Sequence, residues 1–131
     1  DNNFRFYEAL QMECISAARP RIGNSHMGFR NPNSAVVARI RGKVEDFFQI
    51  RVMNIVVSFY PDAASYRPFH TDKFRSGEDI AVICSFGCSR ELVFTHKDME
   101  IEERFELRNG MVMVFDRALN SKWLHGIRPD L

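Results

Sequence analysis

The sequence lacks the paired cysteines that would assign it to the disulfide-rich class of small secreted proteins. Its 131 residues contain three cysteines, Cys14, Cys84 and Cys88, which cannot all pair with one another. A disulfide framework therefore does not fit this chain. Free thiols are typical of a reducing compartment, so we expect an intracellular protein of the nucleus or the cytoplasm.

Long apolar runs and a strong net charge are absent as well, and both absences limit the partners. No stretch approaches the ~18 consecutive apolar residues of a membrane-spanning helix, and no signal peptide is visible. The formal net charge is +1, which provides no overall attraction to nucleic acid, so such contacts would depend on local patches. We expect no membrane partner, and the sequence leaves the oligomeric state open.

The spacing of apolar residues predicts helices in the first part of the chain. It is helical over residues 4–18 and again over 35–49, where Ser34 can cap the second helix. Residues 19–34, rich in Gly, Asn, Pro and Arg, predict a loop with at most a short strand. The apolar face of the second helix would consist of Val37, Ile40, Val44 and Phe47.

After residue 52 the pattern becomes β-branched and aromatic, which favours strands. The first run would be buried on both faces or nearly so, and the fourth is charged and would be exposed. An Asn109-Gly110 turn predicts that the fourth and fifth runs form a hairpin. Helices followed by strands indicate an α+β fold, with helices covering one side of a mainly antiparallel sheet. The predicted strand segments are 52–60, 80–86, 90–96, 97–107, 111–116 and a short apolar one at 122–129.

The length of the chain is that of one domain, so we expect a single domain over residues 1–131. The sequence begins with Asp rather than Met. It ends shortly after an apolar segment that would belong to the sheet. We therefore expect the domain to be truncated at one or both ends.

The tripeptide His70-Thr71-Asp72 comes after an apolar run, at what would be the end of a strand, and separates an imidazole from a carboxylate by one residue. Alternate residues of an extended segment point to the same side, so both side chains would aim at one point. With His125 they would form a set of two histidines and one carboxylate, which holds non-haem Fe(II) and leaves positions open. The spacing alone leaves open that these are surface residues, or that His125 is a satisfied buried histidine.

Three stretches in this order resemble the AlkB family of Fe(II)/2-oxoglutarate-dependent nucleic-acid dealkylases. They are SFYPDAASYRPFHTD, ICSFGCSRELVFTHKD and NGMVMVFDRALNSKWLHGIRP. The similarity covers about residues 34–129, with a weaker one in RPRIGNSHMGF, which is similar to the segment near the nucleotide-binding lid. The resemblance implies a double-stranded β-helix (jelly-roll or cupin-like) core with N-terminal helices packed on one side. It also implies that His70, Asp72 and His125 bind iron.

Further roles follow from the same resemblance. Tyr60 matches a tyrosine that contacts 2-oxoglutarate, and Ser58 stands where the family usually has an asparagine. The family's arginine for the distal carboxylate of 2-oxoglutarate comes further beyond the last histidine than this sequence extends. Arg128 is the candidate in this chain, although it lies three positions from His125 and should face the other way. The substrate-binding candidates are Arg90, Trp123, Arg21 and Lys73, with a sheet-bracing role open for Arg90 and a core role open for Trp123.

The implied activity is oxidative demethylation of N-alkylated bases in DNA or RNA, releasing formaldehyde, succinate and CO₂. It would need Fe(II), 2-oxoglutarate and O₂, with ascorbate as reductant in vitro. Two alternatives stay open: an oxygenase of the same fold that acts on a protein side chain, and a catalytically inactive nucleic-acid-binding module. A structural zinc domain fits poorly, because two histidines and one aspartate without paired cysteines are the wrong ligand set.

Overall fold

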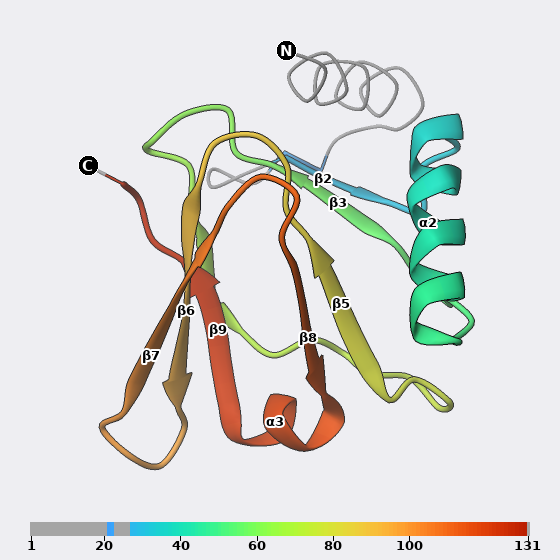
Figure 1. The fold of residues 1–131 in the computed structure, drawn as a ribbon. Coiled ribbons are helices and arrows are strands. Elements are labelled where there is room, and N and C mark those ends of the chain that lie inside the picture. The colour runs from blue at the N-terminus through green and yellow to red at the C-terminus, as the bar shows by residue number, and fades with distance from the viewer. Residues whose placement is uncertain (1–20, 23–26, 131) are drawn as a thin grey trace. The chain divides into compact units, whose positions relative to one another are not determined.

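The computed structural model describes residues 21–22 and 27–130, and the helix expected over residues 4–18 lies outside them. The chain divides into two compact units between Pro61 and Asp62. Both contain mostly antiparallel strands, and each also has one described helix (Figure 1). This confirms a mixed fold of helices and mainly antiparallel sheets. The single domain and the packing of N-terminal helices on one side stay predictions.

The first unit contains a three-stranded antiparallel sheet and one long helix. Its elements are β1 (Arg21–Ile22), β2 (Met27–Arg30), α2 (Ala35–Phe48) and β3 (Val56–Phe59), with the sheet order β1-β2-β3. The backbone N–H of Val37 donates to Ser34 Oγ at 3.2 Å, which confirms the predicted cap and start of α2. Phe29 and Phe59 are buried and meet edge to face, with ring centroids 5.6 Å apart.

Three predictions for this unit were wrong. Residues 19–34 were expected to be a loop with at most one short strand, but they contain β1 and β2. Phe47, placed on the buried face of α2, is 81% exposed, whereas Val37 is buried. The run 52–60 was expected to be buried on both faces or nearly so, but in β3 only Phe59 is buried and Val56 is exposed. The apolar run therefore reflects strand propensity more than burial.

Neither described helix has the length and apolar character that a membrane crossing requires.

The second unit contains six strands in two sheets. The four-stranded sheet has the order β4-β9-β6-β7, and the two-stranded sheet is β5-β8. The elements are β4 (Arg67–His70), β5 (Ile80–Cys84), β6 (Arg90–His96), β7 (Glu102–Leu107), β8 (Val112–Asp116), α3 (Arg117–Lys122) and β9 (Trp123–Ile127). Strands β5 to β9 lie within the predicted segments, whereas β4 and α3 have no counterpart among them.

The strand pairs of this unit are nested. The hairpin β6–β7 is innermost, β5 pairs with β8 outside it, and β4 pairs with β9 outside both, all antiparallel. The predicted hairpin between residues 97–107 and 111–116 is therefore wrong, because β7 pairs with β6 and β8 with β5. The Asn109-Gly110 turn is real, with Gly110 at φ 80°, but it carries the chain from one sheet to the other.

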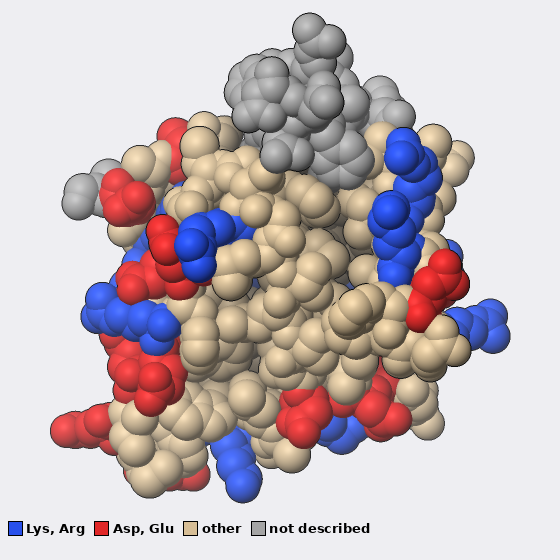
Figure 2. Space-filling view, viewed as in Figure 1, with Lys and Arg blue, Asp and Glu red and all other residues tan. Residues whose placement is uncertain are grey.

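Aromatic and aliphatic side chains of β6 form the centre of this unit. Leu92, Val93 and Phe94 are buried, and the Phe94 ring packs edge to face on Phe115 of the other sheet, with centroids 5.8 Å apart. Burying a side chain of this size stabilises the fold by about 1.5–3 kcal/mol. At the outer edge, β7 is exposed over five of its six residues, as predicted. Charged side chains of both signs gather on this side of the molecule, at the left of Figure 2.

Candidate metal centre

The pairing of β4 with β9 brings together three side chains that are far apart in the sequence. The register places His70 opposite His125, and their ring centroids are 4.4 Å apart. Asp72 Oδ1 lies 3.3 Å from His70 Nε2 and 3.5 Å from His125 Nε2. One ligand atom from each of the three residues lies within 4.8 Å of the other two. The convergence of His70 and Asp72 predicted from their spacing is thus present, and His125 joins them.

The backbone orients the ring of His70. Its Nδ1 lies 2.8 Å from the carbonyl oxygen of Pro68, which can only accept, so Nδ1 carries the hydrogen. Nε2 is therefore the ring atom directed at Asp72, and it is the atom that can coordinate a metal ion. An outer hydrogen bond of this kind is what orients a metal-binding histidine.

Packing, rather than hydrogen bonding, holds the second histidine. His125 is 5% exposed, and its ring lies 5.1 Å from the Phe115 ring and 5.5 Å from the Phe94 ring, centroid to centroid. Within the described residues its Nδ1 is buried without a hydrogen-bond partner. His125 is thus fixed by aromatic neighbours, with Nε2 directed at Asp72.

Gly126 explains how β4 comes so close to β9. A Cβ at this position would lie 2.7 Å from the carbonyl oxygen of Arg67 and 3.1 Å from the Phe69 nitrogen. Real Cβ atoms essentially never come within 3.0 Å of another atom, so the contact with the Arg67 oxygen could not form without a shift of the backbone. The glycine after His125 is therefore required by the contact that places His70 beside His125.

Two opposing effects act on the Asp72 carboxylate. Burial raises its pKa, but the imidazoles of His125 and His70 lower it more, so the net pKa lies below the ordinary value. The carboxylate is therefore ionised at neutral pH and faces two imidazole nitrogens. A divalent cation between them would satisfy all three groups, and two histidines with one carboxylate form the facial ligand set of non-haem iron enzymes. The donor set and its geometry fit such an ion.

The centre is closed on one side and open on the other. The His125 side chain is 7% exposed, whereas that of Asp72 is 39% exposed. The side chain of His70 lies between them at 25%. A ligand from solvent would therefore reach the centre from the Asp72 side.

Two residues at the centre were missed by the sequence predictions. Asn120 Oδ1 accepts from the backbone N–H of Asp72 at 3.0 Å, and Asn120 Nδ2 donates to the Asp72 carbonyl at 2.8 Å. Arg67 Nη2 lies 3.5 Å from His70 Nε2. Three positions apart on a regular strand, Arg67 and His70 would face opposite ways, but the register shifts between them. Neither an asparagine in a short helix nor a shift of register has a sequence signal.

The predicted arginines Arg128 and Arg90 make contacts away from this centre. The guanidinium of Arg128 donates to both carboxylate oxygens of Glu102, at 2.9 and 2.5 Å, and lies over the Phe69 ring. Arg90 donates to the backbone carbonyls of Ser65 at 2.7 Å and of Arg128 at 2.8 Å. These contacts support the bracing role for Arg90.

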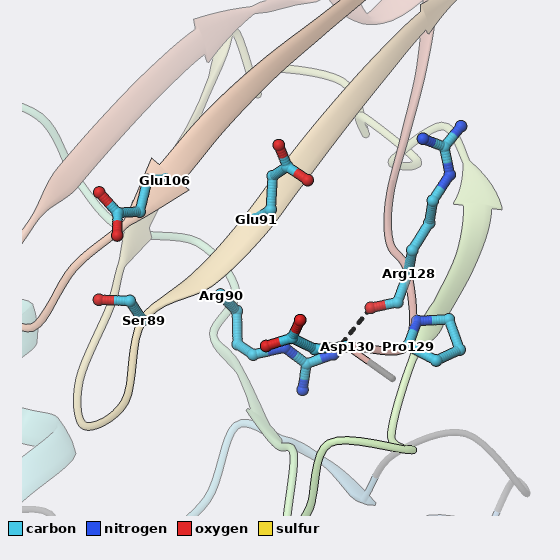
Figure 3. Close-up of a pocket in the computed structure, with 7 residues that line it drawn as sticks. All are labelled: Ser89, Arg90, Glu91, Glu106, Arg128, Pro129 and Asp130. Atoms are coloured by element: carbon cyan, nitrogen blue, oxygen red, sulfur yellow. Dashed lines mark hydrogen bonds between the residues drawn. The ribbon is translucent and has the colours of Figure 1, made fainter.

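Both arginines line a hollow of about 360 Å³ at the carboxyl end of β9, shown in Figure 3. Arg90 reaches across it toward the backbone of Arg128. None of the three centre residues lines this hollow. Its remaining lining residues are Ser89, Glu91, Glu106, Pro129 and Asp130.

The other predicted residues occupy varied places. Trp123 is half-buried, and its ring packs edge to face on His96 with centroids 5.0 Å apart. It is two residues from His125 on β9, so it lies on the same face of the strand. Lys73 is exposed. The remaining three lie in the first unit: Ser58 is exposed in β3, Tyr60 is half-buried just after it, and Arg21 is in β1, its side chain outside the described part.

A scan against protein-family models and a search of curated proteins found no match to this chain.

Proposed function

We propose that this protein is an Fe(II)/2-oxoglutarate-dependent dioxygenase that oxidatively demethylates N-alkylated bases in DNA or RNA, releasing formaldehyde, succinate and CO₂. The observation that carries the proposal is the convergence of His70, Asp72 and His125. Three ligands on one side of an octahedral ion leave three positions open, as a cosubstrate and O₂ require.

The nested strand pairs support a double-stranded β-helix as the fold. The strand pairs β6–β7, β5–β8 and β4–β9 alternate between the two sheets, as they would if one long hairpin were coiled around a core. A jelly roll consists of two such antiparallel sheets. In this arrangement the centre belongs to the outermost pair, β4–β9.

In this proposal the three residues of the centre bind the metal ion, and the side chains around them control what reaches it. The Nε2 atoms of His70 and His125 and the carboxylate of Asp72 would hold Fe(II). The bound ion, with 2-oxoglutarate and O₂, supplies the oxidising chemistry. The Phe94 and Phe115 rings keep water from the His125 side. The exposed side of Asp72 leaves room for a methylated base, which would have to be single-stranded or flipped out of its stack.

The cosubstrate is a dianion, and Arg67 supports its binding. The guanidinium of Arg67 is next to His70 Nε2, and guanidinium groups pair with carboxylates in bidentate fashion. Arg67 would thus supply the positive charge that was predicted for Arg128. The second candidate is an inactive binding module on the same fold. It is favoured by the pairing of Arg128 with Glu102, because this pairing occupies the arginine that was predicted to bind 2-oxoglutarate.

Succinate release is the measurement that tests the proposal. The protein would be incubated with Fe(II), ascorbate and 2-oxoglutarate, with and without a panel of N-methylated DNA and RNA oligonucleotides. We expect succinate that rises with at least one methylated oligonucleotide and is abolished in His125→Ala. His96→Ala, which removes the described histidine outside the centre, should retain activity.

Three other results would change the conclusion. Succinate that rises with peptides and not with oligonucleotides would indicate an oxygenase of protein side chains. Oligonucleotide binding without succinate, both from this chain and from a chain extended at its C-terminus, would indicate the inactive binding module. Neither binding nor turnover would contradict both candidates.

A further inference from the structure

Asp72 lies beyond the last residue of β4, so hydrogen bonds of the strand ladder do not fix its backbone. What fixes it is the side chain of Asn120, 48 positions further along the chain. We propose that Asn120 is a positioning residue that holds the backbone of Asp72, so that its carboxylate meets His70 and His125. This inference rests on the proposed metal site, and it adds a residue that does not itself touch the ion.

The chemistry of an amide suits this task. Asn120 offers one acceptor and one donor in a single plane, and these meet the N–H and the carbonyl of the same residue, at 3.0 and 2.8 Å. Asn120 is also 7% exposed. Its removal would leave both backbone groups of Asp72, which are partly buried, without these partners.

The location of Asn120 links all three ligands to one segment. It lies in α3, which begins after Asp116, whose carboxylate accepts from the Leu119 N–H at 2.8 Å. The helix continues directly into β9, which carries His125. The register of β9 with β4 places His70, and the amide of Asn120 places Asp72. The segment from α3 through β9 therefore carries one ligand, His125, and holds the other two, His70 and Asp72, in position.

A purely structural role, in which the two hydrogen bonds only dock α3, makes a different prediction. It would lower the stability of the metal-free and the metal-loaded protein equally. A positioning role lowers the affinity for the metal as well, because a displaced carboxylate coordinates less well. Residues that orient metal ligands in this way typically contribute about 10- to 100-fold to metal affinity.

The test measures Co(II) binding by titration, the visible spectrum of the bound Co(II), and the rise in Tm that Co(II) produces. Asn120→Ala is expected to bind Co(II) about 10- to 100-fold more weakly, with a changed spectrum and a smaller rise in Tm. Asn109→Ala is the matched control, because it removes a side-chain hydrogen bond to the Gly87 N–H at 2.9 Å in the same unit. Its Co(II) affinity should equal that of the wild type.

Each outcome decides the matter. A folded Asn120→Ala with wild-type affinity and spectrum would overturn the inference while leaving the metal site intact, even if its Tm were lower. If circular dichroism shows Asn120→Ala to be unfolded, the milder Asn120→Ser is measured by the same criteria, since its short hydroxyl cannot reach both backbone groups. A wild-type protein that binds no Co(II) would overturn both this inference and the proposed function.

Discussion

The four-stranded sheet carries ionisable side chains on both of its faces, and the two groups differ in what surrounds their carboxylates. His125 pairs with Phe94, whereas Glu102 pairs with Thr95, the next residue of β6, so the two point to opposite faces. On one face Asp72 meets two imidazoles. On the other, Glu102 meets the guanidinium groups of Arg128 and Arg104.

Both carboxylates have a lowered pKa, so this property does not distinguish a site from a surface network. Arg128, and then Arg104, lower the pKa of Glu102 to about 2. The charge of Glu102 is thereby neutralised by two permanently charged arginines, so its carboxylate oxygens are already occupied and do not attract a metal ion. At Asp72 the partners are two imidazole nitrogens, which can bind a metal ion together with the carboxylate. A converging set of metal-ligand atoms, rather than a carboxylate of lowered pKa, therefore marks a candidate metal site.

The largest expected difference between the two faces is in metal binding. Asp72→Ala removes a ligand and should weaken Co(II) or Mn(II) binding by more than about 100-fold, the upper range for residues that only orient a ligand. Glu102→Ala removes a carboxylate of the opposite face and should leave the affinity unchanged. Isothermal titration calorimetry measures both. Equal losses in the two variants would contradict the distinction between the faces.

A smaller effect is expected at Gly126, where β4 and β9 touch. Gly126→Ala places a Cβ 2.7 Å from the Arg67 carbonyl oxygen, so the strands must separate. We expect a loss of about 1–3 kcal/mol in the free energy of unfolding, as for other overpacked positions, together with weaker metal binding. Gly42→Ala in α2 is the control, because its Cβ meets nothing within 4 Å and should stabilise the helix by about 0.5–1 kcal/mol. Urea unfolding measures both variants, and a Gly126→Ala protein as stable as the wild type would contradict the steric explanation.

The smallest effect belongs to the Glu102 network. Because the folded-state pKa of Glu102, about 2, lies below its ordinary 4.5, its contribution to stability is present above pH ~4.5 and is lost as the pH falls toward ~2. The Tm of Glu102→Gln should therefore fall less steeply than that of the wild type over this range. Since Glu102 pairs at an exposed surface, the difference should shrink in about 1 M salt. An unchanged difference in salt would indicate a contribution other than charge.

Most strands of the second unit could be predicted from the sequence, because β-branched runs bounded by turns are local signals. Their pairing could not. The Asn109-Gly110 turn has the sequence of a hairpin, yet the contacts of β8 with β5 outweigh that local preference. The exposure of Phe47 likewise depends on what lies beside α2, which the periodicity of one helix does not contain.

The candidate metal centre, too, could be predicted from the sequence only in part. Alternation along an extended segment predicted that His70 and Asp72 converge, whereas for His125 the residue types suggested a third ligand and left a buried, satisfied histidine equally open until the resemblance to a family was considered. Arg67 was hidden by a shift of register, and Asn120 by its place in a short helix that no apolar spacing announces. Residues that supply ligands thus left a signal in the sequence, and residues that place those ligands did not.

The nesting of the strand pairs has a consequence for how the protein folds. His70 and His125 are 55 positions apart and belong to the outermost pair, so joining them directly would close the longest loop of the unit. Pairs of low sequence separation form faster, which favours the β6–β7 hairpin as the start and β4–β9 as the last step. The candidate metal centre would then form only when the second unit has completed its fold, and the rate at which refolding protein binds Co(II) would measure that final step.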